Sequence, residues 1–228
     1  MLLADRNLFI SKSERDEVTS NLPVRNPVYA TLAIDTDYYS PGEFSSVESD
    51  YFFTVTWTSR TNAIRKGLIP TIEAFASVAR KSKHLRLVVA GKHGDYLAEL
   101  KKLAQGLGVE DRVEFVGMIS DEEKLFHYRH CLAYVQPTLY EGFGHAIGEA
   151  LACGARVITS PRGAVPEVAG DFAYWVQPDN RDEIASAMEM AFATPVSEED
   201  AHARHLWICS NYSIAARRIA LKGVLDSL

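Results

Sequence analysis

Runs of strand-like composition alternate six times with runs of helical periodicity along most of this chain. The strand-like runs are rich in β-branched and aromatic residues and cover residues 52–58, 85–90, 113–116, 132–135, 156–159 and 174–176. Alternation of this kind predicts an α/β fold, with a parallel sheet and helices on both of its faces. A ligand of an open parallel sheet binds at the carboxyl ends of the strands. We therefore expect the functional groups along one rim, at Gly91, at Gly117 and in residues 137–144 and 160–163.

Helices are expected between and after these strands. They cover residues 67–80, 95–107, 182–193, 198–209 and 213–225, and two more begin at Ser120 and after the glycine turn 142–144. Ser120 and Glu123 have the spacing of a capping box. Ahead of the sheet, Ser13 is expected to cap a helix over residues 13–20, and residues 28–32 to form a strand. Residues 36–50 contain Pro41, Gly42 and several serines, which is typical of a linker.

The composition of the chain narrows its function. Of its 228 residues, 47% are hydrophobic and 24% are charged, which is a globular balance. The formal net charge of −6 argues against nucleic-acid binding. No apolar run approaches the roughly 20 residues of a membrane span, and Asp5 and Arg6 argue against a signal peptide. Three scattered cysteines indicate a reducing, cytoplasmic setting. The basic run 80–84 suits a helix end, and a peripheral membrane role is the lesser alternative.

Two carboxylates, Glu141 and Glu149, lie eight residues apart around a glycine-rich turn that is expected to open a helix. Backbone N–H groups at the start of a helix favour an anion, and glycines let a ligand approach the chain closely. A carboxylate can accept hydrogen bonds from two hydroxyls at once. One short segment therefore offers groups for a phosphate and for a polyol, which is what a nucleotide-sugar needs.

At this point several motifs together resemble a known family. Residues 140–154 resemble the E-x7-E signature of family 4 glycosyltransferases, with Glu141 and Glu149 as the two acids. Arg65-Lys66-Gly67 is similar to the basic pair after the family's first strand. Residues 87–91, 111–117 and 163–167 resemble its second strand, its third strand and its Gly-Gly-x-Pro-Glu loop. Ahead of the linker, residues 33–35 resemble the Asn-Gly-Val-Asp element that closes the N-terminal domain in this family.

The resemblance covers nearly the whole chain and implies the GT-B architecture, in which two Rossmann-like domains enclose the active site. Residues 1–35 would be a remnant of the N-terminal domain, and residues 36–50 the inter-domain linker. Residues 51–212 would form the Rossmann-like donor-binding domain, and residues 213–228 a C-terminal crossover helix. The rest of the N-terminal domain is then expected to be missing from this chain, or to be supplied by a partner chain.

The resemblance also implies a function. The chain would be a glycosyltransferase, or its donor-binding half, that transfers the sugar of a nucleoside-diphosphate sugar with retention, without a metal or other cofactor. The acceptor, whether a glycan, a lipid or a small molecule, stays open, and the chain alone is expected to be inactive. The alternative is a non-catalytic module that binds a nucleotide-sugar, or a subunit that needs a partner chain for activity.

Each acid has a proposed role and a plain alternative. By resemblance Glu149 binds the ribose hydroxyls; otherwise it is an acid that complements a helix N-terminus. Glu141 would contact the transferred sugar and act in catalysis; otherwise it is a solvated loop acid. Gly142, Phe143 and Gly144 would present backbone N–H groups to the donor, although Phe143 is also explained by packing. His145 lies four residues before Glu149 and shares its helix face, so it is counted with the donor-binding group.

Basic side chains would carry the leaving diphosphate. By resemblance Lys66 and Arg65 are the catalytic cations, but the family's usual Gly-Arg positions hold Arg60 and Thr61 here, so Arg60 stays an alternative. The solvated basic loop is the plain reading of these residues. By resemblance the backbone at Gly117, Met118 and Ile119 would edge the base, and Gly91 is also counted with the donor-binding residues on the rim. His127 and His130 lie at helical spacing without other ligands in register, so no metal site is expected.

Overall fold

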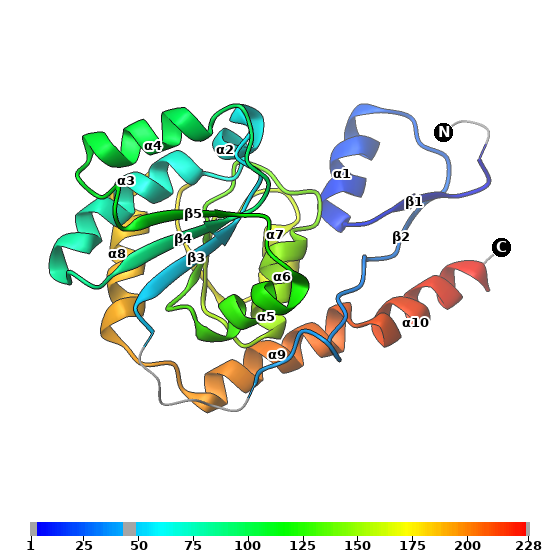
Figure 1. The fold of residues 1–228 in the computed structure, drawn as a ribbon. Coiled ribbons are helices and arrows are strands. Elements are labelled where there is room, and N and C mark those ends of the chain that lie inside the picture. The colour runs from blue at the N-terminus through cyan, green and yellow to red at the C-terminus, as the bar shows by residue number, and fades with distance from the viewer. Residues whose placement is uncertain (1–3, 43–48, 227–228) are drawn as a thin grey trace.

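The computed structural model describes residues 4–42 and 49–226, and Figure 1 shows how they are arranged. Six parallel strands form the main sheet in the order β5-β4-β3-β6-β7-β8. The strands are β3 Tyr51–Val55, β4 Arg86–Ala90, β5 Val113–Gly117, β6 Tyr134–Gln136, β7 Val157–Thr159 and β8 Ala173–Trp175. Each lies within the expected run or within a residue or two of it, so the predicted parallel sheet is confirmed. Strand order reverses between β3 and β6, which is where such sheets open a ligand crevice.

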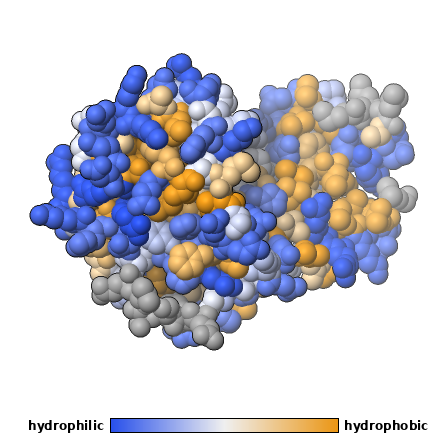
Figure 2. Space-filling view, viewed as in Figure 1, coloured by the Kyte–Doolittle hydropathy of each residue, from blue (hydrophilic) through white to orange (hydrophobic). Residues whose placement is uncertain are grey.

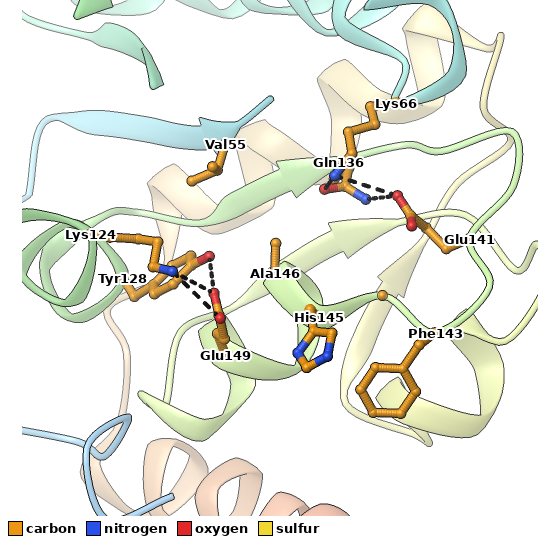
Figure 3. A pocket seen from close by; sticks show the side chains of 11 residues that line it. Val55, Lys66, Lys124, Tyr128, Gln136, Glu141, Phe143, His145, Ala146 and Glu149 are labelled. Atoms are coloured by element: carbon orange, nitrogen blue, oxygen red, sulfur yellow. Dashed lines mark hydrogen bonds and ion pairs between the residues drawn. The ribbon is translucent and has the colours of Figure 1, made fainter. Parts of the chain in front are cut away.

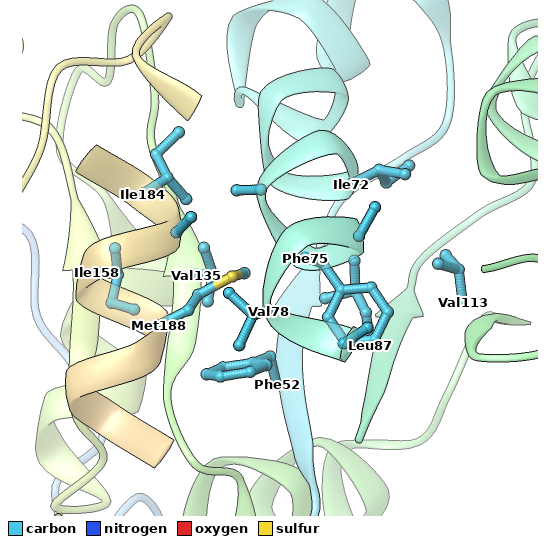
Figure 4. Close-up of a cluster of buried hydrophobic side chains, with 14 of the residues drawn as sticks. Phe52, Ile72, Phe75, Val78, Leu87, Val113, Val135, Ile158, Ile184 and Met188 are labelled. Carbon is cyan, nitrogen blue, oxygen red and sulfur yellow. The ribbon is translucent and has the colours of Figure 1, made fainter. Parts of the chain in front are cut away.

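Helices cover both faces of the sheet, as predicted. On one face, α3 (Leu68–Val78), α4 (Leu97–Gly106) and α8 (Arg181–Ala193) pack on a core that includes Phe52 and Leu87 (Figure 4). On the other face, α5 (Asp121–His130), α6 (His145–Ala152), α7 (Val165–Ala169) and α9 (Glu198–Tyr212) enclose a second core with Phe53 and Val88. Neighbouring residues of a strand enter opposite cores because side chains alternate along it. Strands buried on both faces are largely apolar, which is why β3 contains the apolar run Tyr51–Phe53 and β4 the apolar run Leu87–Ala90.

A small unit precedes the sheet. It consists of β1 (Asn7–Phe9), α1 (Lys12–Asn21) and β2 (Pro27–Tyr29), and its two strands pair in parallel. The predicted cap at Ser13 is wrong: Ser11 is the N-cap, because its hydroxyl accepts from the Glu14 N–H. The Glu167 carboxylate of α7 accepts from the N–H groups of Lys12 (3.0 Å) and Ser13 (2.7 Å). This contact satisfies N–H groups that have no partner inside α1 and ties the unit to the sheet domain.

Two further elements depart from the predicted pattern. The helix expected over residues 67–80 is confirmed as α3, which continues into a 3-10 turn, η1 (Ala79–Lys81). A short helix that the sequence did not predict, α2 (Arg60–Arg65), precedes it, and Gly67, whose φ of 70° no α-helix accommodates, separates α2 from α3. The short helix α7 lies where the sequence predicts a loop, because five residues show no periodicity. Of the predicted linker, residues 36–42 pack against α5 and residues 43–48 lie outside the described residues, as do residues 1–3 and 227–228 of the predicted domains.

The last helix, α10 (Ile214–Leu225), begins at the N-cap Ser213 and leaves Ile219 75% exposed. Figure 2 shows apolar side chains gathered on the lobe that contains β1, α1, β2 and α10, and a second apolar band between hydrophilic residues on the sheet domain. Exposed Leu8, Leu22 and Leu225 belong to this lobe. Across residues 4–42 and 49–226, every helix is too short or too polar to cross a bilayer.

Candidate functional site

A pocket of about 360 Å³ opens at the carboxyl ends of β3 and β6, where the strand order reverses (Figure 3). Its walls come from β3, β6, α5, α6 and the loops before α3 and α6. The residues that line it are Val55, Lys66, Lys124, Tyr128, Gln136, Glu141, Phe143, Gly144, His145, Ala146 and Glu149. Val55 and Gln136 are the last residues of β3 and β6, so the pocket lies on the rim that the sequence predicts.

Glu141 is held by three donors on one side of its carboxylate. Oε1 lies 3.0 Å from Nη1 of Arg65 and 3.5 Å from Nζ of Lys66, and it accepts a hydrogen bond from Nε2 of Gln136 at 2.9 Å. The Glu141 side chain is 13% exposed. Within the described part of the chain, these contacts all fall on Oε1, which leaves Oε2 open to a ligand.

Gln136 joins this group to the sheet. Its Oε1 accepts from the Tyr134 hydroxyl at 2.6 Å and from Nζ of Lys66 at 3.3 Å, while its Nε2 donates to Glu141. Gln136 is 1% exposed, so these bonds satisfy polar atoms that water cannot reach. Burial lowers the pKa of Lys66, and the charge of Glu141 opposes this shift without cancelling it.

Glu149 is held by a second, separate set of donors. The Tyr128 hydroxyl donates to its Oε2 at 3.0 Å, and Nζ of Lys124 lies 3.3 Å from Oε2 and 3.5 Å from Oε1. Burial and the nearby Glu149 charge raise the pKa of Tyr128, so its hydroxyl keeps the proton that it donates. Figure 3 shows Glu141 and Glu149 on opposite sides of the start of α6, each turned toward its own lysine.

Glycines set the two loops that carry the charged groups. Gly144, the N-cap of α6, has a φ of 93° and no side-chain cap, so backbone N–H groups of the first turn are left for a ligand. At Gly163, with a φ of 59°, a Cβ would lie 2.2 Å from the Glu141 carbonyl oxygen. That oxygen also accepts from the Ala164 N–H at 2.9 Å. Only glycine therefore allows the loop before α7 to pack this closely against the backbone of Glu141.

The residues predicted from sequence fall into two groups. The pocket brings together Lys66, Glu141, Phe143, Gly144, His145 and Glu149. Arg65 lies beside them through Glu141 and donates to the Tyr140 carbonyl at 2.9 Å. Gly142 lies in the same turn, outside the lining, and a Cβ there would meet open space.

The other predicted residues lie outside the pocket lining. Arg60 begins α2, with its guanidinium 5.8 Å from the ring centroid of Tyr96. Gly91 is packed against the end of β3, where a Cβ would lie 2.3 Å from the Thr56 carbonyl oxygen. Met118 is 78% exposed on the rim after β5, and Ile119 packs against the core under α5 and α6.

Sequence reasoning missed five lining residues: Val55, Lys124, Tyr128, Gln136 and Ala146. Val55 and Gln136 could have been found, since both end strands that meet at the predicted rim. Lys124 and Tyr128 lie on α5, one turn apart on one helix face, and only tertiary packing brings them to Glu149. The histidines have other partners: the His127 ring stacks on Phe53 at 4.6 Å.

A comparison with known families decides the relationship. Residues 57–204, which include every lining residue except Val55, match the family described as glycosyl transferases group 1. The chain belongs to this family of glycosyltransferases. The match covers more than half of the chain and spans the sheet from the end of β3 to α9.

Similarity to individual glycosyltransferases supports the same family assignment. This glycosyltransferase domain is 27% identical to the O-antigen chain mannosyltransferase B of Escherichia coli over 216 residues, 90% of this chain and 56% of that protein. It is 30% identical to a GDP-mannose-dependent alpha-(1-6)-phosphatidylinositol monomannoside mannosyltransferase of Mycobacterium tuberculosis over 173 residues, 70% of this chain and 44% of that protein. It therefore spans about half the length of these curated relatives.

The fold of a solved structure agrees. The Anabaena protein HepE, in complex with UDP and glucose, superposes with a TM-score of 0.81 at 18% identity, over 99% of this chain and 64% of that structure. At this identity the likeness shows the fold alone. The glycosyltransferase chain thus has the Rossmann-type architecture of GT-B enzymes.

Proposed function

We propose that this chain is the donor-binding part of a glycosyltransferase that takes a nucleoside-diphosphate sugar and transfers the sugar with retention and without a metal. The observation that carries this proposal is the pairing of each pocket acid with its own lysine on opposite sides of the α6 N-terminus. A ligand that spans the pocket would meet a carboxylate paired with a lysine at each end, and backbone N–H groups between the two pairs. A nucleoside-diphosphate sugar has hydroxyls at both ends and a diphosphate between them.

We assign Glu149 to the ribose. Its side chain is 15% exposed and lines the pocket, and a carboxylate can accept hydrogen bonds from the two neighbouring hydroxyls of a ribose. Glu141 and Glu149 would then be the two acids of the E-x7-E signature of family 4 glycosyltransferases. The first acid, Glu141, would accept from hydroxyls of the transferred sugar through its open Oε2.

Lys66 and Arg65 would exchange partners when the donor binds. In the free protein both cations lie against Oε1 of Glu141. A diphosphate entering at the α6 N-terminus offers these cations more negative charge than one carboxylate does, so they would turn toward it and stabilise the leaving group. The same movement would release Glu141 to the sugar. Charge stabilisation by side chains and helix N–H groups is what metal-independent departure of a diphosphate requires.

The choice of donor follows from the relatives as a proposal. Two proteins similar to this chain are named as mannosyltransferases, and one of them is named as dependent on GDP-mannose. We therefore propose GDP-mannose as the first donor to test. The acceptor and the transfer step are proposals for the whole protein, because this chain spans about half of those relatives.

Isothermal titration of the chain with GDP, UDP and GDP-mannose tests the proposal. We expect binding of at least one of these nucleotides, and weaker binding after Glu149→Ala. The matched control is Glu99→Ala, which removes an exposed acid of α4 away from the pocket. Absence of heat with every nucleotide, at concentrations where the protein is folded by circular dichroism, would refute donor binding.

A further inference from the structure

The segment 34–42, which leads from the N-terminal unit toward the sheet, is fixed to α9 and to α5, the helix that carries Lys124 and Tyr128. The Ile34 N–H donates to the Tyr212 carbonyl at 2.7 Å, and the Tyr39 N–H donates to the Asp35 carbonyl at 2.8 Å. From α5, Nε of Arg129 donates to the Ser40 carbonyl at 2.8 Å. Ile34 is 2% exposed and Tyr39 is 8% exposed. A segment with these contacts is part of the packed structure and has one defined position.

Tyr39 packs directly on the two groups that hold Glu149. Nζ of Lys124 lies 5.2 Å from the centroid of the Tyr39 ring, within the range of a cation–π contact. The Tyr39 and Tyr128 rings meet edge to face, with centroids 6.2 Å apart. Burial raises the pKa of Tyr39 to about 12, so its hydroxyl stays neutral beside the lysine. The Tyr39 ring therefore packs against both of the side chains that hold the Glu149 carboxylate.

Lys124 is a flexible side chain that would otherwise sample many rotamers. Here its ammonium is fixed by Glu149, by Asp121 at 3.3 Å and by the Tyr39 ring, and its side chain is 19% exposed. Burial alone would lower the pKa of Lys124, but the hydrogen bond with Tyr39 and the charge of Glu149 raise it above its usual value. The cation is consequently permanent at any physiological pH.

The two donors approach Glu149 from one helix face. Lys124 and Tyr128 lie four residues apart on α5, and both reach the carboxylate from the α5 side of the pocket (Figure 3). Two donors fix the plane of a carboxylate, whereas one donor lets it rotate. A fixed plane matters for a ligand with two adjacent hydroxyls, because both hydrogen bonds must form together.

We propose that Lys124 is a positioning residue that sets the Glu149 carboxylate for a ribose diol, and that Tyr39 of the segment 34–42 holds Lys124 in place. This inference rests on the proposed binding of a nucleoside diphosphate. The segment 34–42 would then do more than connect two parts of the fold. Any movement of these residues would change how well the site distinguishes a ribose from a dideoxyribose, which lacks the two hydroxyls.

Discrimination between two ligands tests the proposal. We would titrate wild type and variants with GDP or UDP, whichever binds, and with the matching 2′,3′-dideoxynucleoside diphosphate, which lacks both ribose hydroxyls. Lys124→Met keeps the length of the side chain and removes its charge. We expect this variant to weaken binding of the ribonucleotide by about tenfold or more. Its affinity for the dideoxynucleotide should stay within about twofold of wild type, because only the ribonucleotide uses the carboxylate. Lys124→Arg should restore most of the discrimination.

Tyr39 variants and a control complete the design. Tyr39→Leu should reduce discrimination in the same direction as Lys124→Met, whereas Tyr39→Phe, which keeps the ring, should retain more of it. Lys101→Met, at an exposed lysine of α4, is the matched control and should change neither affinity. Thermal unfolding of each variant verifies that it is folded, and Lys124→Met decides the question if Tyr39→Leu does not fold.

The outcomes separate this inference from the proposed function. If neither GDP nor UDP binds wild type, the proposed function fails and this inference fails with it. If wild type discriminates and Glu149→Gln does not, but Lys124→Met keeps the full wild-type ratio, donor binding stands and the positioning role of Lys124 is overturned. Equal weakening of both ligands by Lys124→Met shows a general structural effect and overturns it as well.

Discussion

Ile34 fills the space that a side chain on residue 148 would need. A Cβ on Gly148 would lie 2.1 Å from Cδ1 of Ile34, closer than any two carbon atoms can pack. Gly148 precedes the pocket acid Glu149 in α6, and Ile34 belongs to the segment that leads to the sheet. The glycine in the middle of this helix is therefore explained by close packing against a distant part of the chain, not by a turn.

Replacing Gly148 by Ala should destabilise the protein only while Ile34 is present. Overpacking costs about 1–3 kcal/mol, which outweighs the gain of about 1 kcal/mol from better helix propensity. In an Ile34→Val background, which removes Cδ1, the same change should cost little or stabilise. Urea unfolding of the four proteins of this cycle measures the coupling. An equal cost in both backgrounds would contradict the packing explanation.

Affinity for a nucleoside diphosphate should fall at a lower pH than an ordinary lysine would impose. Burial lowers the pKa of Lys66, so its charge is lost as the pH rises through a value below that of an ordinary lysine. The diphosphate keeps its charge over this range, and the attraction between them therefore weakens. Titrations between about pH 7 and pH 10 would measure this loss.

Lys66→Arg is the control for that profile, because a guanidinium keeps its charge throughout this range. Its affinity should be lower at neutral pH, since the larger guanidinium cannot keep the position of the Lys66 ammonium beside Gln136 and Glu141, but it should be nearly independent of pH. A wild-type profile as flat as that of the arginine variant would show that the Lys66 ammonium does not contact the diphosphate.

The sheet, its ligand rim and the acids Glu141 and Glu149 could be predicted from sequence, because strand composition, glycine turns and ordered motifs are local signals. The positions of Arg65 and Arg60 could not be separated in the same way. They lie five residues apart in one basic segment, and only the fold turns Arg65 toward Glu141 and Arg60 toward Tyr96.

The contacts of Tyr39 and Lys124 join segments that are far apart in the chain, and they could not be predicted from the sequence for a physical reason. Tyr39 lies in a segment rich in proline, glycine and serine, which is typical of a linker, yet its ring is buried against α5. Composition reports the conformational freedom of a segment but not the surface on which it packs. Lys124 reads as an exposed residue of a charged helix, and its contact with Glu149 depends on how α5 crosses α6.

Removing the N-cap of α5 should weaken nucleotide binding in the pocket, because this helix carries Lys124 and Tyr128. Ser120 and Glu123 form a capping box, and Ser120→Ala should cost about 1 kcal/mol of stability. The first turn, which contains Lys124, should fray more, so nucleotide affinity should fall by about twofold to fivefold. Ser197→Ala removes a similar cap from α9 and should lower stability without changing affinity. Parallel denaturation and titration of both variants compare them.

Replacing Gly163 by Ala should impair recognition of the sugar more than recognition of the nucleotide. The added Cβ would lie 2.2 Å from the Glu141 carbonyl oxygen, which is backbone and can move only if the loop moves. The hydrogen bond from the Ala164 N–H to that oxygen would break, and the Glu141 carboxylate would lose its position. We expect affinity for a nucleoside-diphosphate sugar to approach that for the diphosphate alone.

Gly108→Ala is the matched control for this last change. Gly108 also has a left-handed backbone, with a φ of 68°, but a Cβ there meets open space. Both alanines should cost about 1–2 kcal/mol from the strained backbone, while only Gly163→Ala should alter the ratio of the two affinities. Titration with GDP and GDP-mannose, or with UDP and UDP-glucose, gives this ratio directly. A Gly163→Ala protein with the wild-type ratio would mean that Glu141 does not contact the sugar, because displacement of its loop would then be without consequence for the ligand.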